Sequence, residues 1–181
     1  MIPDNPLLNT KNDHRLKAIP FGEFKTEHYL PAIEHALAEA KAEIEALKNN
    51  PEAPSFENTI MELELNGELL DYVATIYFNL LGAESDAEFK ALAQQISPML
   101  AEFGSIVSTD PQIFARVKAV YDAEVAGKAK PQLPADMKDK EAIKAAERYR
   151  LIERTYNGFI RGGAMLNDED KKRFTEISME S

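Results

Sequence analysis

The sequence contains no cysteine and no tryptophan, and it has three histidines among 181 residues. Without cysteine the chain has no disulfide scaffold, no thiolate ligand for a metal and no cysteine nucleophile. Basic residues are also in deficit, because 21 Lys and Arg stand against 31 Asp and Glu, a net charge of −10. Since affinity for phosphate backbones depends on clustered Lys and Arg, we expect no nucleic-acid partner. This composition favours a structural role over catalysis.

Long hydrophobic runs are missing as well. The longest apolar runs are a few residues, whereas a membrane-spanning helix needs 18 or more, so we expect no membrane association. Residues 1–8 lack the basic and apolar regions of an export signal. The sequence as given therefore predicts a cytoplasmic protein, with the periplasm as the alternative if a signal peptide has been trimmed. A hydrophobic content of 44% in a chain of this length still predicts a packed core.

Apolar residues recur at steps of three and four from Tyr29 onward, the spacing of one stripe on an α-helix. We predict an all-α fold in which about six amphipathic helices form an antiparallel bundle over residues 26–181, after an extended N-terminal segment over residues 1–25. No alternation typical of strands and no internal repeat occurs. The six expected helices span residues 26–48, 55–81, 85–106, 110–125, 143–159 and 167–181.

Three positions refine this prediction. The apolar periodicity continues through Asn66-Gly67, so we expect one continuous helix there, with Gly67 allowing another helix to approach closely. Pro98 lies inside the third helix and is expected to kink or split it. The sixth helix has barely begun its apolar stripe when the sequence stops at Ser181, which predicts that the given chain is a piece of a longer one.

The residues that carry chemistry show no catalytic pattern. No histidine is followed by glutamate, so the zinc-peptidase motif His-Glu-x-x-His is absent. His28 and His35 lie seven residues apart, about 10 Å along a helix, and we expect capping or packing roles for them. We therefore predict no catalytic, cofactor-binding or metal-binding residue. Paired carboxylates on expected polar faces are interpreted as solvated: Glu39 with Glu43, Glu64 with Glu68, and Glu84 with Glu88. Aromatic residues at helical spacing are interpreted as core rather than as a ligand groove: Tyr72, Tyr77, Phe78 and Phe103.

Several motifs, in order, resemble the N-terminal region of the thimet oligopeptidase and neurolysin family of zinc metallopeptidases. Two of them are the run Phe24–Ile33 and the run from Asn50-Pro51 to Ile60. Five more are similar to the bacterial peptidyl-dipeptidase branch of that family: Asn66-Gly67-Glu68-Leu69-Leu70, Phe78-Asn79-Leu80, Ile96-Ser97-Pro98, Leu100-Ala101 and Phe114-Ala115-Arg116-Val117. The stretch from Tyr156 to Leu166 and the residues Asp168 to Lys171 are similar too. The resemblance extends from about Asn5 to Ile177.

This resemblance implies part of an elongated, neurolysin-like helical protease with a deep channel. In the family, a zinc ion held by His-Glu-x-x-His and a later glutamate activates the water that attacks the peptide bond, and the peptidyl-dipeptidase branch releases C-terminal dipeptides from oligopeptides. That hydrolase machinery lies far downstream of the region matched here. The resemblance therefore implies an N-terminal domain that forms part of the channel wall, with zinc and oligopeptide substrates belonging to the full-length parent and no cofactor in this chain. Such a chain alone is expected to be inactive.

An alternative function remains open on the sequence alone. The chain is also compatible with a free-standing acidic helical module that recruits a protein partner, because residues 1–109 hold 18 acidic and 7 basic groups. If the chain is instead a fragment cut within a helix, apolar surface is left uncovered. We then expect the fragment to self-associate.

Overall fold

The computed structural model describes residues 5–9, 19–83, 86–134, 138–167, 169–170 and 173. Within these ranges the chain is helical and contains no strand, which confirms the all-α prediction. Two short 3₁₀ turns, Pro6–Leu8 and Phe21–Glu23, fall in the segment that was expected to be extended. The helices that follow are α1 (Thr26–Lys48), α2 (Glu62–Leu65), α3 (Glu68–Ala83), α4 (Ala87–Thr109), α5 (Pro111–Glu124) and α6 (Lys140–Arg161).

Five of these helices are long, whereas the sequence predicted about six. The expected sixth helix begins after Asn167, whose side chain accepts a hydrogen bond from the backbone N–H of Asp170 at 2.9 Å. Residues 169, 170 and 173 are helical, and the apolar stripe expected beyond residue 173 lies outside the described residues. None of the described helices is long and apolar enough to cross a bilayer.

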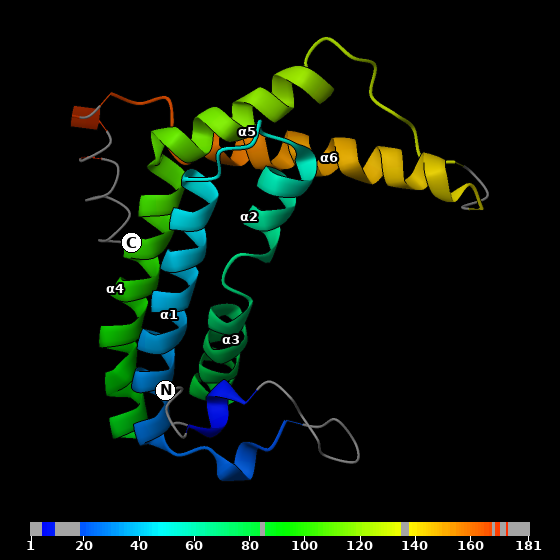
Figure 1. Cartoon of the computed structure of the whole chain (residues 1–181). Coiled ribbons are helices and arrows are strands. Elements are labelled where there is room, and N and C mark those ends of the chain that lie inside the picture. Colours follow the sequence, from blue (N-terminus) through cyan, green and yellow to red (C-terminus); the bar gives the residue numbers. More distant parts are fainter. Residues whose placement is uncertain are drawn as a thin grey trace. The chain divides into compact units, whose positions relative to one another are not determined.

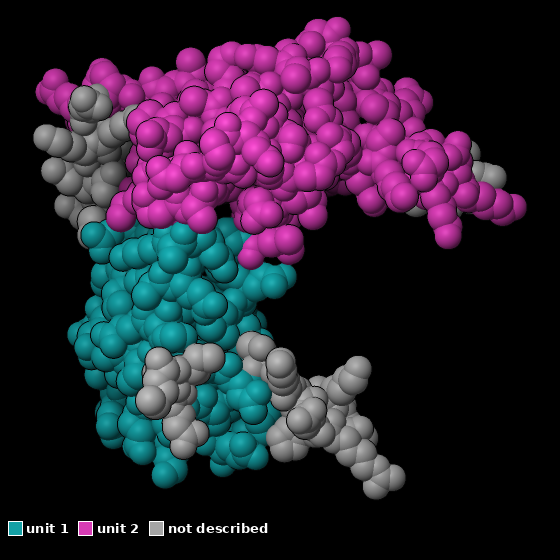
Figure 2. Space-filling view, in the orientation of Figure 1, with its two compact units in different colours: residues 1–43, 66–103 teal, residues 44–65, 104–181 magenta. Residues whose placement is uncertain are grey.

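The chain divides into two compact units, coloured separately in Figure 2. Unit 1 comprises residues 1–43 and 66–103, and unit 2 comprises residues 44–65 and 104–181. In unit 1, α1, α3 and α4 lie side by side, with α3 running opposite to the other two (Figure 1). Their apolar stripes meet in one core, to which Leu7 of the first 3₁₀ turn adds a fully buried side chain.

Aromatic rings organise the centre of unit 1. Tyr29 of α1, Tyr77 of α3 and Phe89 of α4 are buried, and their ring centroids lie 4.8–5.6 Å apart. The Tyr77 hydroxyl donates a hydrogen bond of 2.9 Å to the backbone oxygen of Phe89, so its polar end is satisfied inside the core. Core packing is thereby confirmed for Tyr77, whereas Phe78 is 41% exposed.

Unit 2 is built on the pair α5 and α6, which run in opposite directions (Figure 1). Phe114 and Tyr121 of α5 stack on Tyr156 of α6 with centroid distances of 5.8 and 3.9 Å. Before α2, residues Phe56–Met61 form a π-helix that contacts both α5 and α6. α6 ends at Arg161, and Gly163 just beyond it has a positive φ of 90°, a conformation that favours glycine.

The predicted continuous helix over residues 55–81 is wrong, because the chain leaves the helix at Asn66-Gly67. Gly67 has a φ of +72°, and its N–H donates to the Glu43 carboxylate at 2.9 Å. Asn66 donates through its side-chain amide to the same carboxylate at 2.8 Å and to the backbone oxygen of Ala40 at 3.0 Å. Residues of α1 therefore supply the hydrogen bonds that end one helix and start the next.

The other expectation at Gly67 is confirmed. A Cβ atom on Gly67 would lie 3.4 Å from the Cβ of Ala40, so α1 does approach the backbone closely at this point. Pro98 does not split α4, which runs without interruption from Ala87 to Thr109. Ile106, expected on the buried stripe of that helix, is 49% exposed.

Candidate functional site

The two described histidines both lie on α1. Nδ1 of His28 accepts a hydrogen bond of 3.1 Å from the backbone N–H of Lys25, which satisfies a donor at the start of α1. This confirms the capping role expected for His28. His35 is half-buried on α1.

Two of the predicted carboxylate pairs contain a residue that is bonded rather than merely solvated. Glu43 holds Asn66 and Gly67 as described above, and Glu64 accepts two hydrogen bonds from Nη2 of Arg154, at 2.8 and 2.9 Å. Glu39 is exposed, as predicted. Glu84 lies outside the described residues. The described members of these pairs are all exposed, so none of them is a desolvated carboxyl of the kind that general acid catalysis needs.

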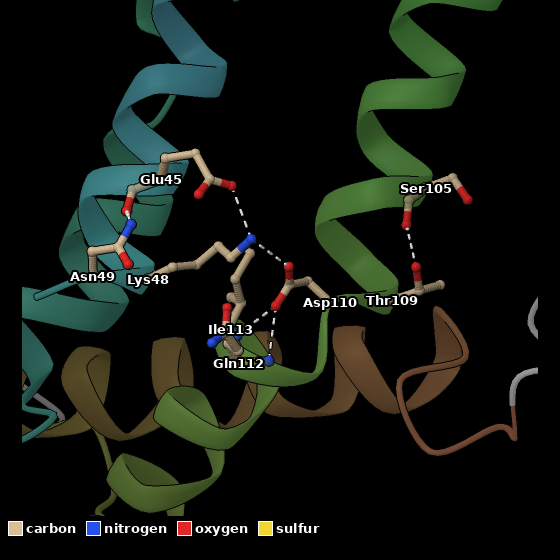
Figure 3. Close-up of polar contacts among 8 residues, drawn as sticks. All are labelled: Glu45, Lys48, Asn49, Ser105, Thr109, Asp110, Gln112 and Ile113. Atoms are coloured by element: carbon tan, nitrogen blue, oxygen red, sulfur yellow. Dashed lines mark hydrogen bonds and ion pairs between the residues drawn. The ribbon is translucent and has the colours of Figure 1, made fainter.

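A group of ion pairs and hydrogen bonds in unit 2 connects the end of α1 to the start of α5 (Figure 3). We call such a group of polar contacts between distant segments a joint. Nζ of Lys48 lies 2.8 Å from Glu45 and 3.0 Å from Asp110. Asp110 also caps α5 by accepting hydrogen bonds from the N–H groups of Gln112 and Ile113 at 2.8 and 3.0 Å. The sequence predicted a helix that begins at residue 110, but it did not predict the lysine partner of Asp110.

The contacts of Asp110 and Lys48 determine the charge that each of them carries. Burial alone would raise the pKa of Asp110, but the hydrogen bonds from Ile113, Lys48 and Gln112 outweigh burial and lower it. The pKa of Lys48 is raised, chiefly by its hydrogen bonds to Glu45 and Asp110. Both groups are therefore charged at neutral pH, and the joint is an ion pair that stabilises the fold.

Arg116 is a second joint, and the sequence reasoning missed it. The residue lies on the buried face of α5 with 9% of its surface exposed. Nη1 donates to the backbone oxygen of Asn50 at 3.0 Å, and Nη2 donates to the side-chain oxygen of Asn58 at 3.2 Å. Two motifs that carry the family resemblance, one from residue 50 to 60 and one around residue 116, are thus in direct contact.

The sequence did contain a signal for Arg116. It occurs at helical spacing with Ile113, Val117 and Val120, which are all buried. A charged residue within an apolar stripe requires partners, because an unpaired buried charge is strongly destabilising. Its carbonyl and amide partners lie 58 to 66 residues away in the sequence, so the stripe alone does not identify them.

Arg148 of α6 forms a third joint. Its guanidinium bonds both oxygens of Glu124 at 2.6 and 2.7 Å and reaches Glu57 at 2.7 Å. It also lies over the ring of Phe56, 4.2 Å from the centroid. These hydrogen bonds, first that to Glu124, raise the pKa of Arg148 despite partial burial, and the bond from Arg148 lowers the pKa of Glu57. The π-helix is thereby attached to both α5 and α6.

Each unit also has a surface hollow. The hollow in unit 1 has a volume of about 380 Å³ and is lined by the second 3₁₀ turn and by residues of α1, α3 and α4. The hollow in unit 2 has a volume of about 650 Å³ and lies between residues 130–133 and the α6 residues Ala146, Glu147 and Arg150. The sequence reasoning predicted neither.

Comparison with characterised proteins identifies the relatives of this chain. No family model matches it. It is 32% identical over 161 residues to the dipeptidyl carboxypeptidase of Escherichia coli, and 32% identical over 177 residues to that of Salmonella typhimurium. These matches cover 89% and 98% of the chain. The chain is a homologue of bacterial dipeptidyl carboxypeptidases. Oligopeptidase A of Haemophilus influenzae is more distant, at 25% identity over 177 residues.

The chain is much shorter than the proteins that it matches. The chain spans 21% and 24% of the two dipeptidyl carboxypeptidases, and 23% of the oligopeptidase A. The order of similarity, with dipeptidyl carboxypeptidase ahead of oligopeptidase A, confirms the branch that the motifs predicted.

The described residues of this dipeptidyl carboxypeptidase homologue do not suit a zinc ion. A zinc site needs three or more His, Cys, Asp or Glu side chains converging on one point. No such group of three occurs in the ranges that the structure describes. What the geometry does provide is a set of buried and half-buried arginine and lysine joints that connect segments distant in the sequence.

Proposed function

We propose that the chain is the N-terminal, non-catalytic part of a zinc metallopeptidase that, when complete, hydrolyses oligopeptides and releases C-terminal dipeptides. The observation that carries this proposal is the match with dipeptidyl carboxypeptidases along 89% and 98% of the chain but along less than a quarter of their length. The sequence also lacks His-Glu-x-x-His. In this proposal zinc and the catalytic groups belong to residues outside these 181.

The role proposed for the chain is that of a wall beside the substrate channel. Such a wall must hold its shape next to a reacting peptide, because small misplacements of a substrate lower the rate. The joints at Lys48, Arg116 and Arg148 support this role, since each connects segments that are distant in the sequence. The wall would exclude folded proteins and admit oligopeptides.

The proposal is tested by measuring zinc content and peptide hydrolysis on the purified chain. After incubation with zinc and dialysis, we expect no stoichiometric metal, and we expect no dipeptide release from a blocked oligopeptide. The Escherichia coli dipeptidyl carboxypeptidase, treated in parallel, serves as the positive control. Stoichiometric zinc or dipeptide release by the chain alone would contradict the proposal.

A further inference from the structure

The hollow in unit 1 is lined by the second 3₁₀ turn, the first turns of α1, one residue of α3 and the start of α4. Its floor consists of the rings of Tyr29 and Phe89, which are 2% and 7% exposed and meet edge to face at a centroid distance of 5.0 Å. Phe24 and the 48% exposed Phe21 form one side. The remaining lining residues are Gly22, Thr26, Leu80 and Asp86. With a volume of about 380 Å³, the hollow suits one side chain or a small molecule rather than a folded partner.

Asp86 is the one Asp, Glu, Lys, Arg or His among the eight lining residues. It is exposed, and its Oδ1 accepts a hydrogen bond of 2.8 Å from the N–H of Phe89 at the start of α4. The N-terminus of a helix carries about half a positive charge, which a full carboxylate charge outweighs. Unit 1 as a whole contains 13 acidic and 6 basic residues, so its field attracts cations.

Aromatic rings beside a carboxylate select a particular ligand chemistry. The negative face of an aromatic ring attracts cations, and a planar guanidinium both stacks on rings and pairs with a carboxylate. Anionic groups are disfavoured by Asp86 and by the charge of the unit. We propose that this hollow binds the side chain of an arginine residue in a peptide, with the guanidinium against the exposed ring of Phe21 and near Asp86. The site lies within unit 1 and does not depend on the proposed function.

The proposal is tested by titrating the isotopically labelled chain with N-acetyl-arginine amide and following amide chemical shifts by NMR. We expect saturable shifts at Gly22, Thr26 and Phe89. N-acetyl-citrulline amide has nearly the same shape without the charge, and we expect it to bind about fivefold more weakly, the effect of one cation–π contact.

Two carboxylate variants separate the site from general attraction to an acidic surface. Asp86→Asn removes the charge but keeps an oxygen that caps α4, so the variant is expected to fold and to bind about fivefold more weakly. Asp71→Asn removes the same charge from an exposed position of α3 outside the hollow. This variant should bind N-acetyl-arginine amide as tightly as the unmodified chain does. Phe21→Ala, at an exposed ring, should also weaken binding.

Three results would overturn the proposal. The first is equal binding of the arginine and citrulline amides. The second is equal weakening by Asp86→Asn and Asp71→Asn. The third is the absence of shifts at Gly22, Thr26 and Phe89 while the chain remains folded by circular dichroism. Each of these measurements uses the chain alone, so its outcome is separate from that of the peptidase proposal.

Discussion

Replacing Gly67 with alanine distinguishes the observed helix break from a continuous helix by the sign of its effect. In a continuous helix, alanine in place of glycine would stabilise the chain by up to about 1 kcal/mol. At the observed φ of +72°, an L-residue instead costs about 1–2 kcal/mol, because its Cβ crowds the carbonyl oxygen. The new methyl group, 3.4 Å from the Cβ of Ala40, fits without a serious clash, so backbone strain is the main term.

A smaller effect acts in the opposite direction. Alanine restricts the unfolded chain and thereby recovers about 0.4–1 kcal/mol. The net expectation for Gly67→Ala is a loss of about 1 kcal/mol in the free energy of unfolding, or a fall of about 2–4 °C in the melting temperature of a chain of this size. Urea denaturation followed by circular dichroism at 222 nm measures this change.

Gly104 provides a matched control. It lies inside α4, and a Cβ added there meets nothing within 4 Å. Gly104→Ala is therefore expected to stabilise the chain by about 0.5–1 kcal/mol, the ordinary gain within a helix. If both substitutions stabilise the chain, the break at Gly67 and the hydrogen bonds assigned to Glu43 are refuted.

Three further predictions concern the joints and the surface of unit 2. Asp110→Ala should lower the free energy of unfolding by about 2 kcal/mol, about 1 from the lost cap and about 1 from the lost ion pair with Lys48. Asp110→Asn keeps the cap and should therefore lose about half as much. Because the pKa of Asp110 is lowered on folding, the unmodified chain should have a higher free energy of unfolding than Asp110→Asn above about pH 4. This difference should shrink as the pH falls further. A difference that is unchanged at pH 2 would contradict the pairing. Arg148→Met should lower the free energy of unfolding by about 1 kcal/mol at low salt and by less in 1 M NaCl. Arg148→Lys should not restore this loss, because lysine cannot pair with Glu124 through two nitrogens. Urea denaturation of both variants at the two salt concentrations measures these changes. The chain should dimerise at high concentration in sedimentation experiments, with Met165→Lys, at a residue that is 70% exposed, shifting it toward monomer; a strict monomer at high concentration would count against this expectation.

Much of the helical fold is predictable because its signals are local. The apolar stripe of α1, at Ile33, Leu37, Ala40, Ile44 and Leu47, is buried as its spacing predicts. Asp110 begins α5, and Ser55 begins the π-helix, through caps that depend on the next three residues. Such signals need no knowledge of the rest of the chain.

The break at residues 66 and 67 is the clearest failure, and its cause is tertiary. Apolar spacing continues across it, and Leu70 beyond the break is still buried, so periodicity carries no trace of the interruption. The decisive bonds come from Ala40 and Glu43 on another helix. The Asn-Gly pair is a turn signal that permits the break, and the bonds from α1 decide between a turn and a continued helix.

The joints escaped prediction for the same reason. Arg148 meets Glu57 across 91 residues of sequence, and Arg116 meets Asn58 across 58. Pairings over such distances depend on how the helices pack, which hydrophobic periodicity does not specify. The hollow in unit 1 likewise arises where the residues before α1 meet α3 and the start of α4, so the motifs that contain some of its lining residues do not predict it.

We propose that these 181 residues are one part of a longer peptidase. The decisive experiment is to sequence the encoding gene beyond the codon for Ser181. We predict an open reading frame that continues for most of the length of a dipeptidyl carboxypeptidase and contains His-Glu-x-x-His. A stop codon directly after Ser181 would contradict the claim and favour a free-standing acidic interaction module.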